Sequence, residues 1–425
     1  MTTGRPPVVR RAPGKLFVAG EYAVVEPGNP AVLVAVDRYV TATVTEPAGT
    51  GTAVSSDLLA APVRWLRRGD RLDPVGVEDA DRARRELAHV LAALRTVTRL
   101  LAEHGRPAPE LDIAISSELH QDGVKFGLGS SGAVTVATVA AVAAHCGLTL
   151  SAEERYRLAL LASAELDPKG SGGDLAASTW GGWIAYRAPD RAAVLDLVRR
   201  RGVAGALAEP WPGFEVRRLP PPPGVALEVG WTGTPASTTE LVSGLHRRAW
   251  RGTPPHRRFV AASADLVRAA ADALEHGDRP ALLDSVRRAR RELARLDEEA
   301  GLGVFTPALT ALCDTAEAVG GAAKPSGAGG GDCGIALLEV PDTRTAPEAL
   351  DAPEAPEAPG PRATHDTRAT PDAPGTRTAP GPAASHNSHA GATGASPDID
   401  HLRERWAAAG VRPLDLRPAT EGNEE

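Results

Sequence analysis

The amino-acid sequence predicts a mixed α+β fold, and three features support this prediction. Residues 8–46 alternate short apolar segments with turns, which is typical of strands. Residues 84–104 place apolar side chains on one face at helical spacing. Strands and helices do not alternate regularly along the chain, so an open βαβ sheet is not expected. With 425 residues, the chain is long enough for two domains or one large one.

The expected elements follow from local apolar patterns in chain order. The first half should contain strands at 16–19, 31–36, 111–115 and 183–186, and helices at 84–104, 132–146 and 153–164. The second half should contain strands at 225–231 and 334–340, and helices at 237–250, 257–275, 279–299 and 306–319.

Residues 341–396 differ in composition from the rest of the chain. They consist mainly of Ala, Pro, Thr, Gly, Asp and His, and Leu350 is their only large aliphatic residue. Such a segment buries too little apolar surface to offset its ordering entropy, so we expect disorder. An apolar helix and strand follow it, up to Leu416. We interpret 341–396 as an insertion in the last domain. A linker to a separate tail is the weaker alternative, because about 30 residues rarely form a core.

The overall composition excludes several classes of protein. A net charge of −7 and a pI near 5.9 argue against a nucleic-acid binder. The three cysteines show no metal-ligand spacing and fit a reducing cytosol. The N-terminus has no apolar signal region, and the apolar stretch 133–146 is too short to cross a bilayer. We therefore expect a cytoplasmic protein with no membrane or nucleic-acid partner.

Lysine is rare in this chain, and the lysines share one kind of sequence environment. Of the 47 basic Lys and Arg residues only Lys15, Lys125, Lys169 and Lys324 are lysine, and each lies in or beside a glycine-containing segment. Lysine is a compact point charge, unlike the wide guanidinium of arginine. This pattern favours small cations at an anion site, although chance is an alternative in a chain with 44 glycines.

The segment Gly127-Leu128-Gly129-Ser130-Ser131-Gly132 leads directly into a long apolar helix. Glycines let backbone N–H groups approach an anion, and a helix N-terminus adds partial positive charge. The string also fits the dinucleotide fingerprint, but no strand runs directly into it. It is not a Walker A motif, since no lysine follows it. A plain tight turn is the remaining alternative.

Three further segments carry candidate chemistry. Residues 324–334 hold five glycines within eight residues, which favours a backbone that contacts an anion. Asp174 follows the glycines of 169–173 and is either a base, a metal ligand or a helix N-cap. Lys15 enters an apolar strand and is either snorkelling or aimed at a ligand.

Taken in order, these segments resemble the motifs of the GHMP kinases. The matching strings are APGKLFVAGEYAVV from residue 12, FGLGSSGAV from 126, GGDLAASTWGG from 172 and KPSGAGGGDCGIAL from 324. The resemblance implies a ribosomal-S5-like N-terminal domain at 8–222. It also implies a ferredoxin-like C-terminal domain at 223–340 plus 397–418, with the active site in the cleft between the two domains.

The resemblance also implies roles for individual residues. Lys15 and Asp174 would be catalytic, with Mg²⁺ held by Ser131 and Glu165. The ATP-binding residues would be Lys125, Gly127, Leu128, Gly129, Ser130, Ser131, Gly132, Ser326, Gly327, Ala328, Gly329 and Gly330. The acceptor-binding residues would be Glu21, Tyr22, Lys169, Ser171, Gly172 and Asp332.

Within the family, several sequence features resemble one branch. That branch phosphorylates phosphomevalonate to diphosphomevalonate in the mevalonate route to isoprenoids. Gly20-Glu21-Tyr22, Asp332 and residues 229–242 resemble that branch. A kinase for mevalonate or another small alcohol is the nearest alternative. A nicotinamide-dependent oxidoreductase and a non-catalytic binding module are alternatives from other classes. A monomer and a homodimer are both compatible with the sequence.

Overall fold

The computed structural model describes residues 5–69, 71–236, 250–340, 397–420 and 422. An eight-stranded sheet forms from the first half of the chain, in the order β10-β9-β2-β6-β3-β4-β5, with β1 paired to β2. Neighbouring strands are antiparallel except β3 and β6, which are parallel. Its strands are β1 (Val8–Ala19), β2 (Pro30–Thr45), β3 (Thr52–Ser56), β4 (Val63–Arg68), β5 (Arg71–Val75), β6 (Asp112–Ser117), β9 (Trp183–Arg187) and β10 (Glu215–Leu219).

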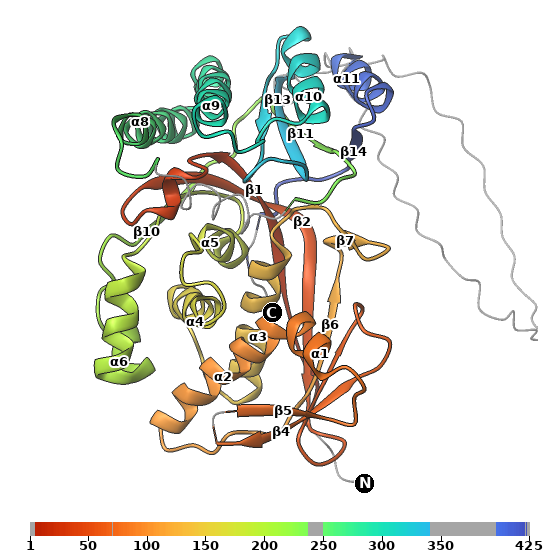
Figure 1. Cartoon of the computed structure of the whole chain (residues 1–425), viewed down its shortest axis with the longest axis vertical. Coiled ribbons are helices and arrows are strands. Elements are labelled where there is room, and N and C mark those ends of the chain that lie inside the picture. Colours follow the sequence, from red (N-terminus) through yellow and green to blue (C-terminus); the bar gives the residue numbers. More distant parts are fainter. Residues whose placement is uncertain (1–4, 70, 237–249, 341–396, 421, 423–425) are drawn as a thin grey trace, which may run out of the picture.

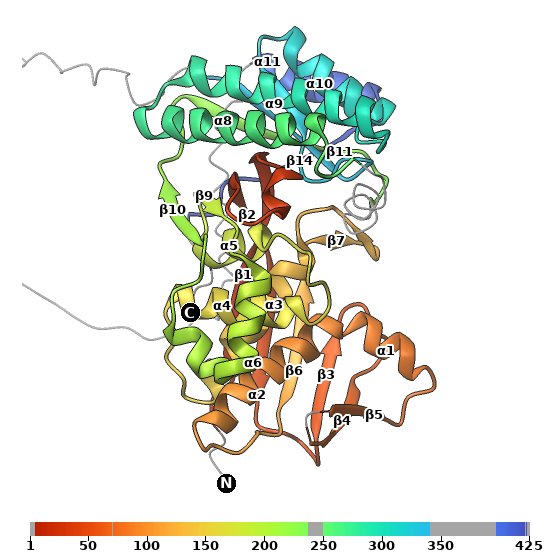
Figure 2. The same ribbon diagram turned by 60° about the vertical axis from the view of Figure 1, so that its left-hand side comes forward.

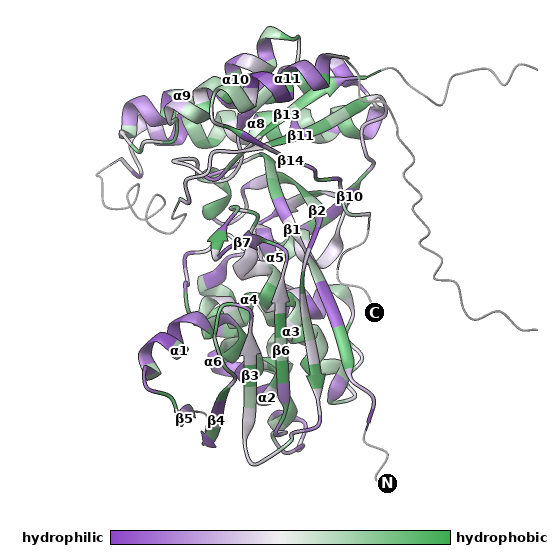
Figure 3. Ribbon diagram, turned by 90° about the vertical axis from the view of Figure 1, so that its right-hand side faces the viewer, coloured by the Kyte–Doolittle hydropathy of each residue, from purple (hydrophilic) through white to green (hydrophobic). Residues whose placement is uncertain are grey.

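Helices cover one face of this large sheet, as Figure 1 shows. The helices of this half are α1 (Ala80–Glu86), α2 (Ala88–Glu103), α3 (Ser130–His145), α4 (Ala152–Ala164), α5 (Gly173–Trp180) and α6 (Arg191–Ala208). Helix α3 lies against β1 and β2 and is buried nearly all round, which its run of Ala and Val allows. The opposite face of the sheet is turned toward the viewer in Figure 3.

A four-stranded sheet, in the order β12-β13-β11-β14, forms from the second half. Its strands are β11 (Val225–Trp231), β12 (Ala322–Pro325), β13 (Cys333–Glu339) and β14 (Arg412–Leu414), and its helices are α8 (Pro254–His276), α9 (Arg279–Ala300), α10 (Pro307–Ala318) and α11 (Pro397–Ala408). Figure 2 shows α8 and α9 side by side. We propose that the boundary between the predicted domains, at 222/223, falls in the turn between β10 and β11.

The two halves share one apolar core. A single cluster of buried side chains runs from Leu16 and Leu33 in the large sheet to Val267 in α8, Val286 in α9 and Leu337 in β13. Beyond β14 the chain returns to the large sheet. Pro418 bridges to Val36, and the Ala419 amide donates to the Ala35 carbonyl at 2.9 Å.

The α+β prediction is confirmed, and most predicted elements are present within one to four residues of their expected ends. The predicted helix 84–104 divides at Leu87 into α1 and α2. Strands β3 to β5, β10 and β12 and helices α5 and α6 were not predicted, and α6 is kinked at Gly202, where φ is 73°. The predicted helix at 237–250 falls almost entirely, and the predicted disorder at 341–396 falls wholly, outside the described residues. No helix in the described ranges is long and apolar enough to cross a membrane.

Candidate active site

Strand β1 brings Lys15 to the glycine loop that precedes α3. The Lys15 amide donates to the Leu128 carbonyl at 2.8 Å, and its side chain is only 8% exposed. The side chain passes so close to Gly129 that a Cβ there would lie 2.9 Å from the Lys15 Cε. Within the described residues, the Nζ atom has no hydrogen-bond or ion-pair partner. Lys15 is therefore a buried ammonium directed into the site, and does not merely snorkel to solvent.

The N-terminus of α3 is built to receive an anion. Gly129 occupies the N-cap position in the left-handed conformation, and no side chain caps the helix. The amides of the first turn, which begins at Ser130 and Ser131, are thus left for another acceptor. The loop follows a two-stranded hairpin of β7 (His120–Gln121) and β8 (Val124–Lys125). No strand of the large sheet runs into it, so the dinucleotide-fold alternative is wrong.

Asp174 lies in the first turn of α5 and faces the same loop. The N-cap of α5 is Gly172, and no side chain caps this helix, so the interpretation of Asp174 as an N-cap is wrong. A Cβ on Gly132 would lie 2.6 Å from the Asp174 Oδ2, and one on Gly129 would lie 3.5 Å from its Cβ. Gly129 therefore separates Lys15 from Asp174, and Gly132 is required by the carboxylate.

The glycines of the loop 326–332 serve two different purposes. Gly327 faces the site, since the Lys15 Nζ is 4.0 Å from the position of a Cβ there. Gly329 instead approaches the backbone of Val304, and Gly331 approaches that of Thr234, each within 2.5 Å of the Cβ position. The Gly330 amide donates to the Val304 carbonyl at 2.8 Å. Close packing against other backbone segments therefore explains why Gly329 and Gly331 are glycines, whereas the sequence predicts that the glycines of this loop contact an anion.

Asp332 lies at the contact between the two glycine loops. Its side chain is 2.4 Å from the position of a Cβ on Gly127, and its Oδ1 accepts from the Ala236 amide at 3.0 Å. Its φ is 52°, a conformation that Asp tolerates better than most residues. Burial raises the pKa of Asp332, which the Ala236 amide, Lys15 and Lys125 partly offset.

Glu21 and Tyr22, predicted to bind the acceptor, instead make contacts within the protein. Glu21 forms a buried ion pair with Lys324, which is 0% exposed. The Tyr22 hydroxyl donates to the Ala328 carbonyl at 2.5 Å. The Ser326 Oγ accepts from the Phe17 amide at 2.8 Å. These contacts join β1 and its following turn to the loop 324–328, so Lys324 does not belong to an anion-binding lysine set.

Two buried tyrosine side chains lie against the segment that precedes Asp174. The Tyr186 hydroxyl donates to the Ser171 carbonyl at 2.6 Å and contacts the Tyr156 hydroxyl at 2.8 Å. Gly172, at φ 76°, leaves room for both hydroxyls, which would lie 3.0 and 3.1 Å from a Cβ there. Lys169 is exposed on the same segment. Burial raises the pKa of both tyrosines, so they act as neutral hydrogen-bonding groups.

Glu165 does not fit the predicted metal role. Its two carboxylate oxygens are bound by Arg95 at 2.9 Å and Arg99 at 2.7 Å. Within the described ranges, no group of three or more His, Cys, Asp or Glu side chains forms a metal site. The contacts therefore make Glu165 a partner of α2.

His89 belongs to the site, although the sequence analysis did not single it out. Its Nδ1 lies 3.3 Å from the Thr135 Oγ1, whose proton goes to the Ser131 carbonyl at 2.7 Å. Burial and Lys125 lower the pKa of His89, whereas Asp174 raises it. A lone histidine within the apolar pattern of α2 was the only sequence signal.

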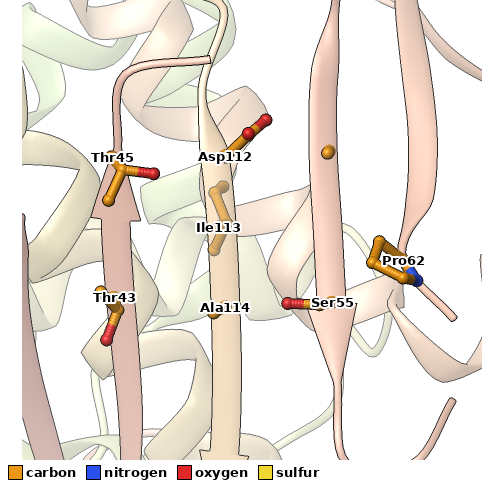
Figure 4. Close-up of a pocket in the computed structure, with 8 residues that line it drawn as sticks. Thr43, Thr45, Ser55, Pro62, Asp112, Ile113 and Ala114 are labelled. Carbon is orange, nitrogen blue, oxygen red and sulfur yellow. The ribbon is translucent and has the colours of Figure 1, made fainter. Parts of the chain in front are cut away.

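A separate pocket lies on the open face of the large sheet (Figure 4). Thr43, Ser55 and Asp112 line it from β2, β3 and β6. Lys15 pairs with Ala35 in β2, so Thr43 lies eight residues further along the strand, or roughly 27 Å at the usual rise. This pocket is therefore distinct from the site around Lys15.

The site thus places a buried ammonium, a carboxylate and an uncapped helix N-terminus around one loop. This arrangement can bind a polyphosphate and stabilise charge that moves between two phosphoryl oxygens. The family models described as "GHMP kinases N terminal domain" and "GHMP kinases C terminal" match residues 88–182 and 270–356. The chain belongs to the GHMP kinase family, as the motifs predicted.

Comparison with individual proteins shows which kinases of this family the chain resembles. The chain is 58% identical to the phosphomevalonate kinase of Streptomyces sp. (strain CL190) over 426 residues, covering 99% of this chain and 100% of the relative. Identity to the mevalonate kinase of Thermococcus gammatolerans is 30% over 346 residues, covering 80% of this chain and 91% of that one.

Solved structures agree on the fold. The Lin0012 protein of Listeria innocua has a TM-score of 0.77 and 28% identity, covering 99% of this chain and 100% of that one. The Streptococcus pneumoniae phosphomevalonate kinase in complex with phosphomevalonate and AMPPNP has a TM-score of 0.72 and 24% identity, covering 97% of this chain and 100% of that one.

Proposed function

We propose that this chain transfers the γ-phosphoryl group of ATP to the phosphate of phosphomevalonate, forming diphosphomevalonate and ADP in the mevalonate route to isoprenoids. The observation that carries the proposal is the position of Lys15 and Asp174 on two sides of Gly129, beside the uncapped N-terminus of α3. The 58% identity over the full length of a phosphomevalonate kinase supports the choice of acceptor.

The charge of the acceptor determines which chemical problem the site must solve. A phosphomonoester has a second pKa of about 6 and is mostly dianionic at neutral pH. One of its oxygens attacks the γ-phosphorus while the bond to the β–γ bridging oxygen breaks, so no proton needs to be removed. The difficulty is to bring two polyanions together in line. Lys15 supplies positive charge there, and Asp174, which lies across Gly129 and forms no ion pair with Lys15, orients the acceptor.

The three glycine segments divide the remaining roles. We assign the nucleotide phosphates to the first turn of α3 and to the loop around Gly327, with Lys125 at the edge of the site. We assign the acceptor to the segment Lys169–Gly172, with Asp332 between the two loops. Glu21 and Tyr22 hold the loop 324–328 in place and are not assigned a contact with substrate.

We propose Ser131 as the residue that would hold a magnesium ion. The Ser131 hydroxyl at the start of α3 is a hard oxygen donor beside the phosphate-binding amides, and the Asp174 carboxylate packs on the neighbouring Gly132. Ser131 would hold Mg²⁺ together with phosphate oxygens of the nucleotide. The ion would neutralise phosphate charge. Glu165 is excluded from this role by its two arginine partners.

An assay of ADP release tests the proposed acceptor. Purified enzyme with ATP and Mg²⁺ is compared across phosphomevalonate, mevalonate, homoserine and galactose. We expect the highest kcat/KM with phosphomevalonate. Faster turnover of mevalonate would contradict the assignment. We also propose a cytoplasmic enzyme, because its cysteines are free and buried. Its acceptor and nucleotide are small molecules, and light scattering would decide between monomer and homodimer.

A further inference from the structure

Arg191, the first residue of α6, is a buried cation without a carboxylate partner. The residue is 8% exposed. Its Nε donates to the Pro168 carbonyl at 3.3 Å and its Nη2 to the Val25 carbonyl at 2.5 Å. Its Nη1 is buried and has no hydrogen-bond partner. In the described part of the chain, no Asp or Glu lies within ion-pair distance of Arg191.

This position is unfavourable for a cation for two reasons. A buried guanidinium loses hydration that two neutral carbonyls replace only in part. Arg191 also lies in the first turn of α6, where the helix dipole is positive and favours an anion. The neighbouring Asp190 caps α6 by accepting from the Ala193 amide at 3.1 Å, and it forms no ion pair with Arg191. Arg191 therefore contacts this segment as a buried cation without a direct ion-pair partner among the described residues.

That segment is the one that precedes Asp174. Arg191 binds its Pro168 carbonyl, and Tyr186 binds its Ser171 carbonyl at 2.6 Å. A phenol has one proton, so the Tyr186 proton goes to Ser171 and Tyr156 donates to Tyr186. Two buried side chains from α6 and β9 thus hold both ends of 168–171. Lys169, between them, is exposed.

Arg191 also reaches the other side of the site. Its bond to the Val25 carbonyl holds the short helix η1 (Ala23–Val25), which follows Glu21 and Tyr22. One guanidinium therefore fixes the distance between the turn after β1 and the segment 168–171. Its charge acts on both tyrosines, on which the charge of Asp174 also acts.

We propose that Arg191 is a positioning residue of the acceptor site: it holds the segment 168–171, and its charge, which has no direct ion-pair partner in the described ranges, favours binding of an anionic, phosphate-bearing acceptor beside Lys169. This inference rests on the proposed function, because it assigns the acceptor to that segment.

Two substitutions separate charge from hydrogen bonding. Arg191→Lys keeps the charge, and Arg191→Gln keeps donors without charge. We expect the Gln variant to raise the KM for phosphomevalonate by about tenfold or more, the scale of a lost charged hydrogen bond. The KM for ATP should stay within about twofold, and the Lys variant should recover most of the acceptor affinity. Added salt should raise the acceptor KM less in the Gln variant than in wild type.

Arg187→Gln is the matched control. Arg187 lies on the adjacent β9, is about half exposed, and pairs with Glu215 at 3.0 Å. It should leave both KM values unchanged. The proposal is overturned if Arg191→Gln leaves the acceptor KM at the wild-type value, or if it raises both KM values equally. If the Arg191 variants do not fold, Tyr186→Phe decides, and an unchanged acceptor KM in that variant overturns the proposal.

The kinetics of the wild-type enzyme distinguish a wrong role for Arg191 from a wrong proposed function. If the wild-type enzyme prefers mevalonate to phosphomevalonate, the proposed acceptor is wrong. The Arg191 variants are then measured with mevalonate, whose carboxylate is also an anion. A rise in the KM for mevalonate alone would still support the role of Arg191, and equal rises in both KM values would overturn it.

Discussion

Lys324 and Glu21 form an ion pair that is closed to solvent, with side chains 0% and 3% exposed. Lys324 lies in β12 of the small sheet, and Glu21 lies in the turn after β1 of the large sheet. The Lys324 Nζ also donates to the Pro325 carbonyl at 2.8 Å. The pair therefore fastens the loop 324–328 to the strand that carries Lys15.

Glu21→Gln should lower the free energy of unfolding by about 3 kcal/mol or more, because it leaves a buried ammonium without its counter-charge. Urea unfolding measures this change. Glu299→Gln removes a partly exposed ion pair with Arg258 and should cost less than about 1 kcal/mol. Equal effects of the two substitutions would show that burial adds nothing to the Glu21 pair.

Lys15→Arg should reduce kcat nearly as much as Lys15→Ala. The Lys15 side chain passes Gly129 at 2.9 Å from a Cβ position and is 8% exposed, so a wider guanidinium does not fit without displacing the loop. A displacement of about 1 Å costs roughly 100-fold in rate. Steady-state kcat, with ATP binding measured separately, tests this. An Arg variant that keeps more than about a third of wild-type kcat, a barrier change under about 1 kcal/mol, contradicts the compact-cation role.

Gly132→Ala should impair turnover while the fold remains intact. Gly132 has ordinary helical dihedrals, so its backbone accepts alanine, but the new Cβ would lie 2.6 Å from the Asp174 Oδ2. The carboxylate must move, and we expect kcat to fall by about tenfold or more. Gly49→Ala is the control, because the nearest atom there is 3.5 Å from the Cβ position. Wild-type kcat in Gly132→Ala would mean that the position of Asp174 is not critical.

Asp332→Asn should raise stability increasingly as the pH rises. Burial raises the pKa of Asp332 in the folded state, so the folded protein holds the proton more tightly than the unfolded chain does. Asp332 therefore contributes most favourably to the free energy of unfolding at low pH. This contribution is lost as the pH rises from the pKa of Asp332 in the unfolded chain, about 4, through its higher pKa in the folded protein. Asparagine keeps an acceptor for the Ala236 amide and tolerates φ 52°. Urea unfolding at pH 4 and pH 7 tests this, and a constant difference between the two proteins would contradict it.

Contiguous patterns made much of the fold and part of the site predictable. The apolar runs of α3, α8 and β13 and the loop 127–132 each lie within one stretch of sequence. Strand β3 was missed because Thr52–Ser56 is short and mostly polar, and β4 and β5 were missed because arginines accompany their few apolar residues, as in Val63–Arg68. Arg191, Tyr186 and His89 were missed for a different reason. Each belongs to a helix or strand that does not include its partner at the site, 15 to 46 residues away along the chain, and only the tertiary fold brings them to the segment 168–174 and to α3.

Glu165 and Lys324 show the converse error. A charged residue near a glycine motif suggests chemistry, but pairing with Arg95 and Arg99, or with Glu21, is decided by which elements pack together. Local sequence carries no information about these partners.

The return of the chain to the large sheet after β14 has a consequence for folding during synthesis. Pro418 and Ala419 pair with β2, and the Gly182 amide donates to the Ala419 carbonyl at 2.5 Å. These contacts join residues that lie more than 200 positions apart along the chain, a separation that slows folding. The Ala35 carbonyl and the Gly182 amide therefore lack these partners until residues 418 and 419 have left the ribosome.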